Sequence, residues 1–281
     1  MDVITRVAGT GVADRAGGPL ATEADLNNPM GMAMTADGGF LIADTGNHVV
    51  RRVSAAGVIT RVAGNFFQGN SGDGGLAIDA EFNFPQGVAV TADGGFLIAD
   101  TGNHVVRRVS GAAGVIEPVA GTGVAGNSGD GGPAADAQLH SPQGVAVTAD
   151  GGLLIVDRYN SVVRMVSVAG VITRVAGTGT LGNSGDGGPA TGAKLALPEG
   201  VAVTADGGFL IADTGNNEVR RVSAAGVITR VAGTGAAGNS GDDGLATDAM
   251  LTHPTGVAVT ADGGFLIADT GNNEVRKVAP G

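Results

Sequence analysis

The sequence contains no cysteine and no tryptophan, and tyrosine occurs only once among its 281 residues. Without cysteine, the chain forms no disulfide bonds and has no thiolate chemistry. It also has no run of 18 or more apolar residues, so we expect no membrane-spanning helix. The first residues lack the basic and apolar regions of a signal peptide. If the chain is complete, these features favour a cytoplasmic location.

Positive charge is scarce as well. The chain holds 27 acidic residues against 16 lysines and arginines, which gives a formal net charge of −11. Nucleic-acid binding needs clustered Lys and Arg that displace counterions, so the charge argues against this class of function. An anionic membrane surface is disfavoured for the same reason. We therefore expect a small molecule or a protein as the partner, and we expect the chain to be a monomer.

Glycine, in contrast, is abundant, with 52 residues placed mostly at recurring turn positions. One segment, Pro-x-Gly-Val-Ala-Val-Thr-Ala-Asp-Gly-Gly-Phe-Leu-Ile-Ala-Asp-Thr-Gly-Asn, recurs in close variants at a nearly fixed period. A period of about 56 residues with strand-like content indicates a repeat architecture. No linker interrupts the copies, so we predict a single domain over residues 1–281. The copies begin at Pro29, Pro85, Pro142, Pro198 and Pro254.

Each copy contains four short runs of β-branched and apolar residues separated by glycine-rich turns. In the second copy these runs are residues 87–91, 96–100, 104–109 and 115–120. No run has the 3.6-residue period of a helix. Four-stranded antiparallel units at a constant period are typical of β-propeller blades. We therefore predict an all-β, five-bladed β-propeller.

The two ends of the chain support a propeller over an open solenoid. Residues 3–8 match the fourth strand of every copy, and residues 273–278 match the third strand. The N-terminal strand can thus complete the last blade and close the ring, which leaves no unpaired sheet edge. An open solenoid of five sheets would not explain these permuted ends.

The repeat resembles a known family. Leu-Ile-Ala-Asp-Thr-Gly-Asn-His followed by Val-Val-Arg-Arg-Val, residues 41–53, is similar to the NHL repeat, and Asn-Ser-Gly-Asp-Gly-Gly-Pro-Ala extends the similarity. The resemblance covers essentially the whole chain, although family members usually have six blades. It implies a protein-interaction module, an RNA binder, an extracellular sensor or a lyase or hydrolase, and alone it fixes none of these. The charge disfavours RNA binding. The metal-dependent lyases need several histidines at corresponding blade positions, whereas this chain has four histidines in two loop types.

The copies agree at one end of the predicted blades and differ at the other. The differing end carries the turn between the second and third strands and the long crossing loop to the next blade. Four of the eight phenylalanines gather in the second crossing loop, and they either line an apolar recognition pocket or pack the loop onto its blades. These four are Phe66, Phe67, Phe82 and Phe84.

Other departures from the repeat lie at the same end. In the third copy Arg158 and Tyr159 replace the usual Thr-Gly, which favours a functional role over a structural one. His48 and His104 share one repeat position, which indicates either a surface polar site or a general base. We expect three methionines after the first crossing loop to pack beneath the loops. They are Met30, Met32 and Met34.

Acidic residues recur at two repeat positions. The Asp at the end of each second strand can accept backbone N–H bonds, and its recurrence indicates a structural role. The Asp in each Asn-Ser-Gly-Asp loop falls short of the clustered oxygens that calcium needs. We therefore expect no metal site and no cofactor. The two sets are Asp44, Asp100, Asp157, Asp213 and Asp269, and Asp73, Asp130, Asp186 and Asp242.

We thus expect a propeller that binds a ligand or a protein through its long-loop end, near the second and third blades, without chemistry. The four loop phenylalanines would supply apolar contact, and Arg158 and Tyr159 polar and π contact. One alternative is an enzyme, a lyase, hydrolase or cyclase that acts on a small molecule. Another is an engineered or recently duplicated scaffold with no specific ligand. In the enzyme, the catalytic residues would be His104, His140, Arg158 and Tyr159.

Overall fold

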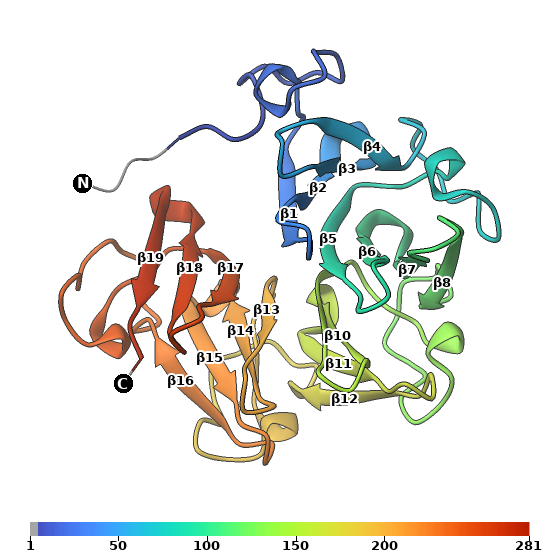
Figure 1. Ribbon diagram of the computed structural model, residues 1–281. Helices are drawn as coiled ribbons and strands as arrows, with labels where there is room; N and C mark the ends of the chain where they lie inside the picture. Colours follow the sequence, from blue (N-terminus) through green and yellow to red (C-terminus); the bar gives the residue numbers. More distant parts are fainter. Residues whose placement is uncertain (1–4, 281) are drawn as a thin grey trace. The chain divides into compact units, whose positions relative to one another are not determined.

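The computed structural model describes residues 5–280, and each repeat copy in it forms one antiparallel sheet whose strands follow in sequence order. Figure 1 shows the strands of each sheet side by side. This confirms the predicted all-β, five-bladed β-propeller class. The strands of the first two blades are β1 (Pro29–Met34), β2 (Phe40–Asp44), β3 (Val49–Val53), β4 (Ile59–Ala63), β5 (Pro85–Val90), β6 (Phe96–Asp100), β7 (Val105–Val109) and β8 (Ile116–Ala120).

The chain forms two compact units, Met1–Val124 with the first two blades and Ala125–Gly281 with the other three. The single domain over residues 1–281 remains a prediction. The strands of the second unit are β9 (Pro142–Val147), β10 (Leu153–Asp157), β11 (Val162–Val166), β12 (Ile172–Ala176), β13 (Val201–Val203), β14 (Phe209–Asp213), β15 (Glu218–Val222), β16 (Ile228–Ala232), β17 (Pro254–Val259), β18 (Phe265–Asp269) and β19 (Glu274–Val278).

The described helices are all single 3-10 turns of three residues, five in the crossing loops and five between second and third strands, so no described helix could span a membrane. Those in the crossing loops are η1 (Ala21–Glu23), η3 (Ala77–Asp79), η5 (Ala134–Asp136), η7 (Ala190–Gly192) and η9 (Ala246–Asp248). Those between strands are η2 (Thr45–Asn47), η4 (Thr101–Asn103), η6 (Arg158–Asn160), η8 (Thr214–Asn216) and η10 (Thr270–Asn272).

The core lies between neighbouring blades and beneath the crossing loops. In the first unit, Leu41 and Val50 of one blade belong to the same buried cluster as Ile98 of the next. The second unit repeats this arrangement, with Leu154 and Ile211 in one cluster. In the fourth blade both faces are covered in this way, so its second strand, β14, is a continuous apolar run without alternation.

A recurring hydrogen bond brings the crossing loop and the strand-2 to strand-3 turn to one end of each blade. Asp100, the last residue of β6, accepts the backbone N–H of Asn83 at 2.8 Å. The amide of Asn103 in the following turn donates to the same carboxylate at 2.9 Å. The predicted structural role of this Asp is therefore visible in the fold. We call this end of a blade, with its crossing loop and 3-10 turn, the long-loop end.

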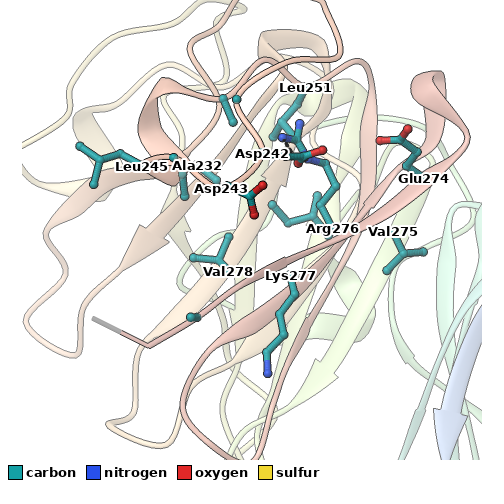
Figure 2. Close-up of a pocket in the computed structure, with 16 residues that line it drawn as sticks. Ala232, Asp242, Asp243, Leu245, Leu251, Glu274, Val275, Arg276, Lys277 and Val278 are labelled. Atoms are coloured by element: carbon teal, nitrogen blue, oxygen red, sulfur yellow. Dashed lines mark hydrogen bonds and ion pairs between the residues drawn. The ribbon is translucent and has the colours of Figure 1, made fainter. Parts of the chain in front are cut away.

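The fifth blade has three described strands, β17, β18 and β19. A groove of about 740 Å³ runs beside β19 and the fifth crossing loop. Figure 2 shows Arg276 and Asp242 next to each other beside this groove. The strand predicted to complete this blade, residues 3–8, falls partly on residues 1–4, which lie outside the described residues. Residues 5–8 form no strand, so the ring closure stays a prediction.

Candidate functional site

In the second, third and fourth blades, a buried arginine lies at the centre of the long-loop end. Sequence reasoning did not predict its role. The Arg107 side chain has no exposed surface. Its Nη2 and Nε donate to Oδ1 of Asp73 at 2.6 and 2.9 Å, and its Nη1 lies 3.4 Å from Oδ2 of Asp100. The loop Asp that resembled a calcium ligand is therefore the counter-ion of this guanidinium. The same pairing joins Arg164 to Asp130, Arg220 to Asp186, and Arg276 to Asp242.

The strand-end carboxylates of these blades lie in a low-dielectric environment. Burial raises the pKa of Asp100, Asp157 and Asp213 to about 6, although amide and guanidinium donors act in the opposite direction. The charged network is thus structural and serves to tie the crossing loop to its blade. Across residues 5–280 no group of three His, Cys, Asp or Glu side chains is arranged to hold a metal ion.

The four phenylalanines of the second crossing loop lie in different environments. Phe82 has no exposed surface and packs in the core of the first unit, where the equivalent residues of other copies are leucines. The Arg107 guanidinium lies 5.0 Å from its ring centroid. Phe67 is 67% exposed and Phe84 46% exposed, whereas Phe66 is half-buried. Three of the four phenylalanines therefore have exposed surface that a ligand could contact, and Phe82 has none.

His48 links neighbouring blades of the first unit. Its Nδ1 accepts the backbone N–H of Phe84 at 3.2 Å, and the two rings meet edge to face at 4.8 Å. Burial lowers the pKa of His48, which favours the neutral, accepting imidazole. Asn217 makes the same contact in the second unit, where its side-chain oxygen accepts the N–H of His253 at 3.0 Å. In these two copies the side chain at this repeat position is therefore a structural tie between blades.

Arg158 begins the turn η6 in the third blade, where the other copies have threonine. In the fourth blade the equivalent Thr214 hydroxyl donates to the carbonyl of Pro254 in the next blade at 2.7 Å. Arg158 instead forms an ion pair with Glu199 in the next blade, with Nε and Nη2 each 3.1 Å from Oε1. The substitution thus replaces one tie between blades by another and brings a charge to the long-loop end.

Tyr159 follows in the turn, where the other copies have glycine. The residue is 51% exposed, and its ring contacts two neighbours. The Arg158 guanidinium lies 4.8 Å from its ring centroid, and the His140 ring lies 5.0 Å away. The structure therefore brings together three of the predicted site residues, His140, Arg158 and Tyr159, within the second unit. His104 belongs to the first unit.

Sequence reasoning did not include Glu199 and His253 among the site residues, although Glu199 lies beside Arg158 and His253 lies near Glu199. Glu199 is the only acidic residue directly after a repeat proline, a signal that the sequence contains. Burial raises its pKa, while the charges of Arg158 and His253 oppose the rise. We call Glu199 and His253, together with His140, Arg158 and Tyr159, the third-blade cluster. It combines an exposed aromatic ring, a guanidinium, a carboxylate and two imidazoles.

The prediction for the methionines of β1 was wrong. Met30, Met32 and Met34 do not pack beneath the loops but point to solvent, with Met32 71% exposed. Val88 of the second blade, the equivalent of Met32, is buried against the first blade. The methionines lie on the face of β1 opposite to the residues that contact the second blade, and they do not belong to either group of candidate site residues.

Comparison with known families identifies the repeat. The family model described as the NHL repeat matches residues 82–108, 195–221 and 251–278. The model described as the Teneurin NHL domain matches residues 117–184. NHL repeat-containing protein 2 of Bos taurus is 29% identical over 270 residues, which cover 85% of this chain and 37% of that protein. The chain thus spans about a third of the relative's length.

Solved structures share the fold at low sequence identity. A chain from a nidogen/laminin complex matches with a TM-score of 0.63 and 15% identity, and the match covers 92% of this chain and 78% of that one. A streptogramin B lyase matches with a TM-score of 0.52 and 13% identity, over 86% of this chain and 62% of the lyase. At these identities the matches establish the fold alone, and one fold supports both binding and catalysis.

Proposed function

Because the chain belongs to the NHL-repeat family of β-propellers, we propose that it is a recognition module that binds a partner protein at its long-loop end. The third-blade cluster supplies the central contacts. Phe67 and Phe84 are exposed in the first unit, and we propose them as a separate apolar contact. Protein interfaces concentrate their binding energy in a few Tyr, Trp and Arg residues, which fits a cluster built on Arg158 and Tyr159.

The observation that carries this proposal is the way Tyr159 is held. Tyr159 is 51% exposed, yet its ring contacts both the Arg158 guanidinium and the His140 ring. An aromatic side chain that is fixed before binding loses little rotamer entropy on association. The ion pair to Glu199 fixes Arg158 in turn. The four other copies form the same turn with glycine, so the fold itself does not need a tyrosine there.

The repeat offers a matched variant for the test. Arg158→Thr with Tyr159→Gly restores the turn of the other copies and should leave the blade folded. We expect this double variant to lose partner binding by about thirtyfold, the effect of removing one hot-spot residue worth about 2 kcal/mol. Affinity capture of partners, quantified by mass spectrometry, compares it with the wild type. Adding Phe67→Ala tests the apolar contact of the first unit.

Val168→Ala is the control for this experiment. Val168 is an exposed apolar residue in the same blade, in the turn between β11 and β12 at the opposite end. It should capture the same partner as the wild type. A partner retained equally by the wild type and by the Arg158→Thr, Tyr159→Gly variant would overturn the proposal, provided that both proteins melt at the same temperature.

A second candidate function is supported by Glu199. Its pKa is raised by burial, and it lies beside Arg158 in a cluster with two imidazoles and a phenol. A carboxyl group with a raised pKa can serve as a general acid in a lyase or hydrolase. Turnover of small lactones or esters that follows a bell-shaped pH profile, and is abolished in Glu199→Gln, would favour this function. Loss of partner capture in the same variant without turnover would favour recognition.

A further inference from the structure

Arg51 of the first blade occupies the same repeat position as Arg107 but has a different environment. The first crossing loop reads Asp14-Arg15-Ala16 where the second has the stretch that supplies Asp73, and it contains no equivalent carboxylate. Arg51 Nε therefore turns to Oδ2 of Asp44 at 2.7 Å. Its side chain is 9% exposed, and its Nη2 has no hydrogen-bond partner among residues 5–280. Leaving a charged donor unpaired in a buried position is costly.

Two more arginines gather at this place. The guanidinium carbons of Arg15, Arg51 and Arg61 lie 5.9, 6.0 and 5.2 Å from the centroid of the Phe66 ring. Arg61 Nη1 donates to the carbonyls of Gly64 and Ile78. Arg15 replaces an asparagine of the other crossing loops. Three positive groups around one ring are unusual in a chain with a net charge of −11.

Phe66 is held in a conformation that phenylalanine rarely adopts. Its φ is +72°, in the left-handed region, where a bulky side chain is strained. The equivalent residue in every other crossing loop is a glycine with positive φ. These glycines are Gly11, Gly123, Gly179 and Gly235. The lost Asp, the new Arg15 and the strained Phe66 are three separate departures from the repeat, and all three lie around Arg51.

We propose that Arg51, Arg15 and Arg61 bind the carboxylate of a ligand, which takes the place that Asp73 has beside Arg107. The ligand carboxylate would accept from Arg51 Nη2, and Phe66 would contact the ligand's body. The site lies within the first unit and is independent of Arg158 and Tyr159. It is therefore a second binding site, beyond the proposed recognition of a partner protein.

The chemistry at this site favours a carboxylate over a phosphate. In the four other blades this guanidinium is neutralised by a carboxylate, so the geometry is already that of an arginine–carboxylate pair. Asp44 pairs with Arg51, and Oδ1 of Asp14 accepts the N–H of the neighbouring Arg15 at 2.7 Å.

Calorimetric titration of the full chain with sodium acetate and sodium benzoate, at constant ionic strength set with chloride, tests the proposal. We expect saturable 1:1 binding, with a shift of the Arg51 side-chain resonances. Arg15→Asn restores the repeat residue and should weaken binding at least tenfold. Replacing residues 14–19 with Gly-Asn-Ser-Gly-Asp-Gly-Gly, the sequence of residues 69–75, restores the Asp and should abolish binding. Arg52→Gln is the control, because Arg52 pairs with Asp37 at the opposite end of the blade.

Three results would overturn the proposal. They are the absence of binding for both carboxylates, equal binding by the loop-replacement variant, and tighter binding of inorganic phosphate than of either carboxylate. The source of the carboxylate is tested with a short peptide that ends in a free carboxyl group and with its amidated form. Tighter binding of the free-acid peptide than of acetate assigns the site to a peptide terminus. Binding of acetate and benzoate but neither peptide assigns it to a free organic acid.

Discussion

Two kinds of position meet at the long-loop end of each blade, and they differ in what they contribute. The buried Asp–Arg network around Arg107 recurs with nearly the same distances around Arg164 and Arg220. The substituted positions, such as Phe66 and Tyr159, occur once each and break the repeat. The network ties the crossing loop to its blade and is the same in the four blades whose loop supplies the Asp. The substitutions add exposed or strained groups that the other blades do without. Residues that stabilise the blade and residues proposed for recognition therefore lie side by side at the long-loop end.

The largest effect should come from breaking the network. Arg107→Met removes a guanidinium with no exposed surface and leaves the buried carboxylate of Asp100 without its cation. We expect a loss of about 3–5 kcal/mol in the free energy of unfolding. Arg51→Met should cost about half as much, because Arg51 has one carboxylate partner and an unpaired Nη2. Urea denaturation of both variants measures the difference, and equal losses would mean that the loop Asp contributes nothing.

The pH dependence of stability compares the network with exposed carboxylates. Asp100 has an ordinary pKa of 3.8 when unfolded and about 6 when folded, so the folded state binds its proton more tightly. Its contribution to stability is full below pH 3.8 and is lost as the pH rises through about 6. Asp93 behaves in the opposite way, because a hydrogen bond from Thr91 lowers its pKa to about 2. Its contribution is full above pH 3.8 and is lost as the pH falls through 2.

Urea denaturation of the wild type and of Asp100→Asn between pH 4 and 7 tests this sign. The wild type should lose stability relative to the variant as the pH rises, since only the wild type must release a proton from the buried carboxyl. Parallel curves would mean that Asp100 stays ionised throughout, held by Arg107 and the amide donors. A nuclear magnetic resonance titration of the Asp100 side-chain carbon would then show no midpoint in this range.

The sequence predicts the repeated part of this architecture and not the buried charges. The period, the four strands and the Asp that ends each second strand follow from alternation and turn residues. In Val-Val-Arg-Arg-Val, however, two adjacent arginines point to opposite faces of the strand. Arg107 is buried while Arg108 is exposed and pairs with Asp93 at the opposite end of the blade. Only the return of the crossing loop onto the sheet places Asp73 beside Arg107.

The candidate sites were predictable to the extent that they break the repeat. Tyr159 and Phe66 stand out because four other copies show what the turn needs. The role of Phe82 could also have been found, since the equivalent residues are leucines in the core. The pairing of Arg158 with Glu199 could not, because the two residues lie 41 positions apart in neighbouring blades, and their contact depends on how the blades pack.

A smaller effect of opposite sign is expected at Phe66. Phe66→Gly relieves the left-handed strain, and we expect the protein to become more stable by about 1 kcal/mol. The lost contacts between the ring and the guanidiniums of Arg15, Arg51 and Arg61 offset part of this gain. Thermal and urea denaturation measure the change. A destabilised variant would mean that Phe66 packs as a structural residue, and the departure at this position would then need no ligand to explain it.

The smallest change in stability is expected where recognition is proposed. The Arg158→Thr, Tyr159→Gly variant exchanges the ion pair with Glu199 for the bond from a threonine hydroxyl to the next blade that Thr214 makes. One tie replaces another of similar strength, and a half-exposed ring contributes little to the core, so we expect a change within about 0.5 kcal/mol. Urea denaturation checks this, with Tyr159→Gly alone to isolate the ring. A loss above about 2 kcal/mol in the free energy of unfolding would show that the third-blade cluster stabilises the fold. Arg158 and Tyr159 would then be structural residues like the Asp–Arg network, and the distinction between stability and recognition would not hold at the proposed binding site.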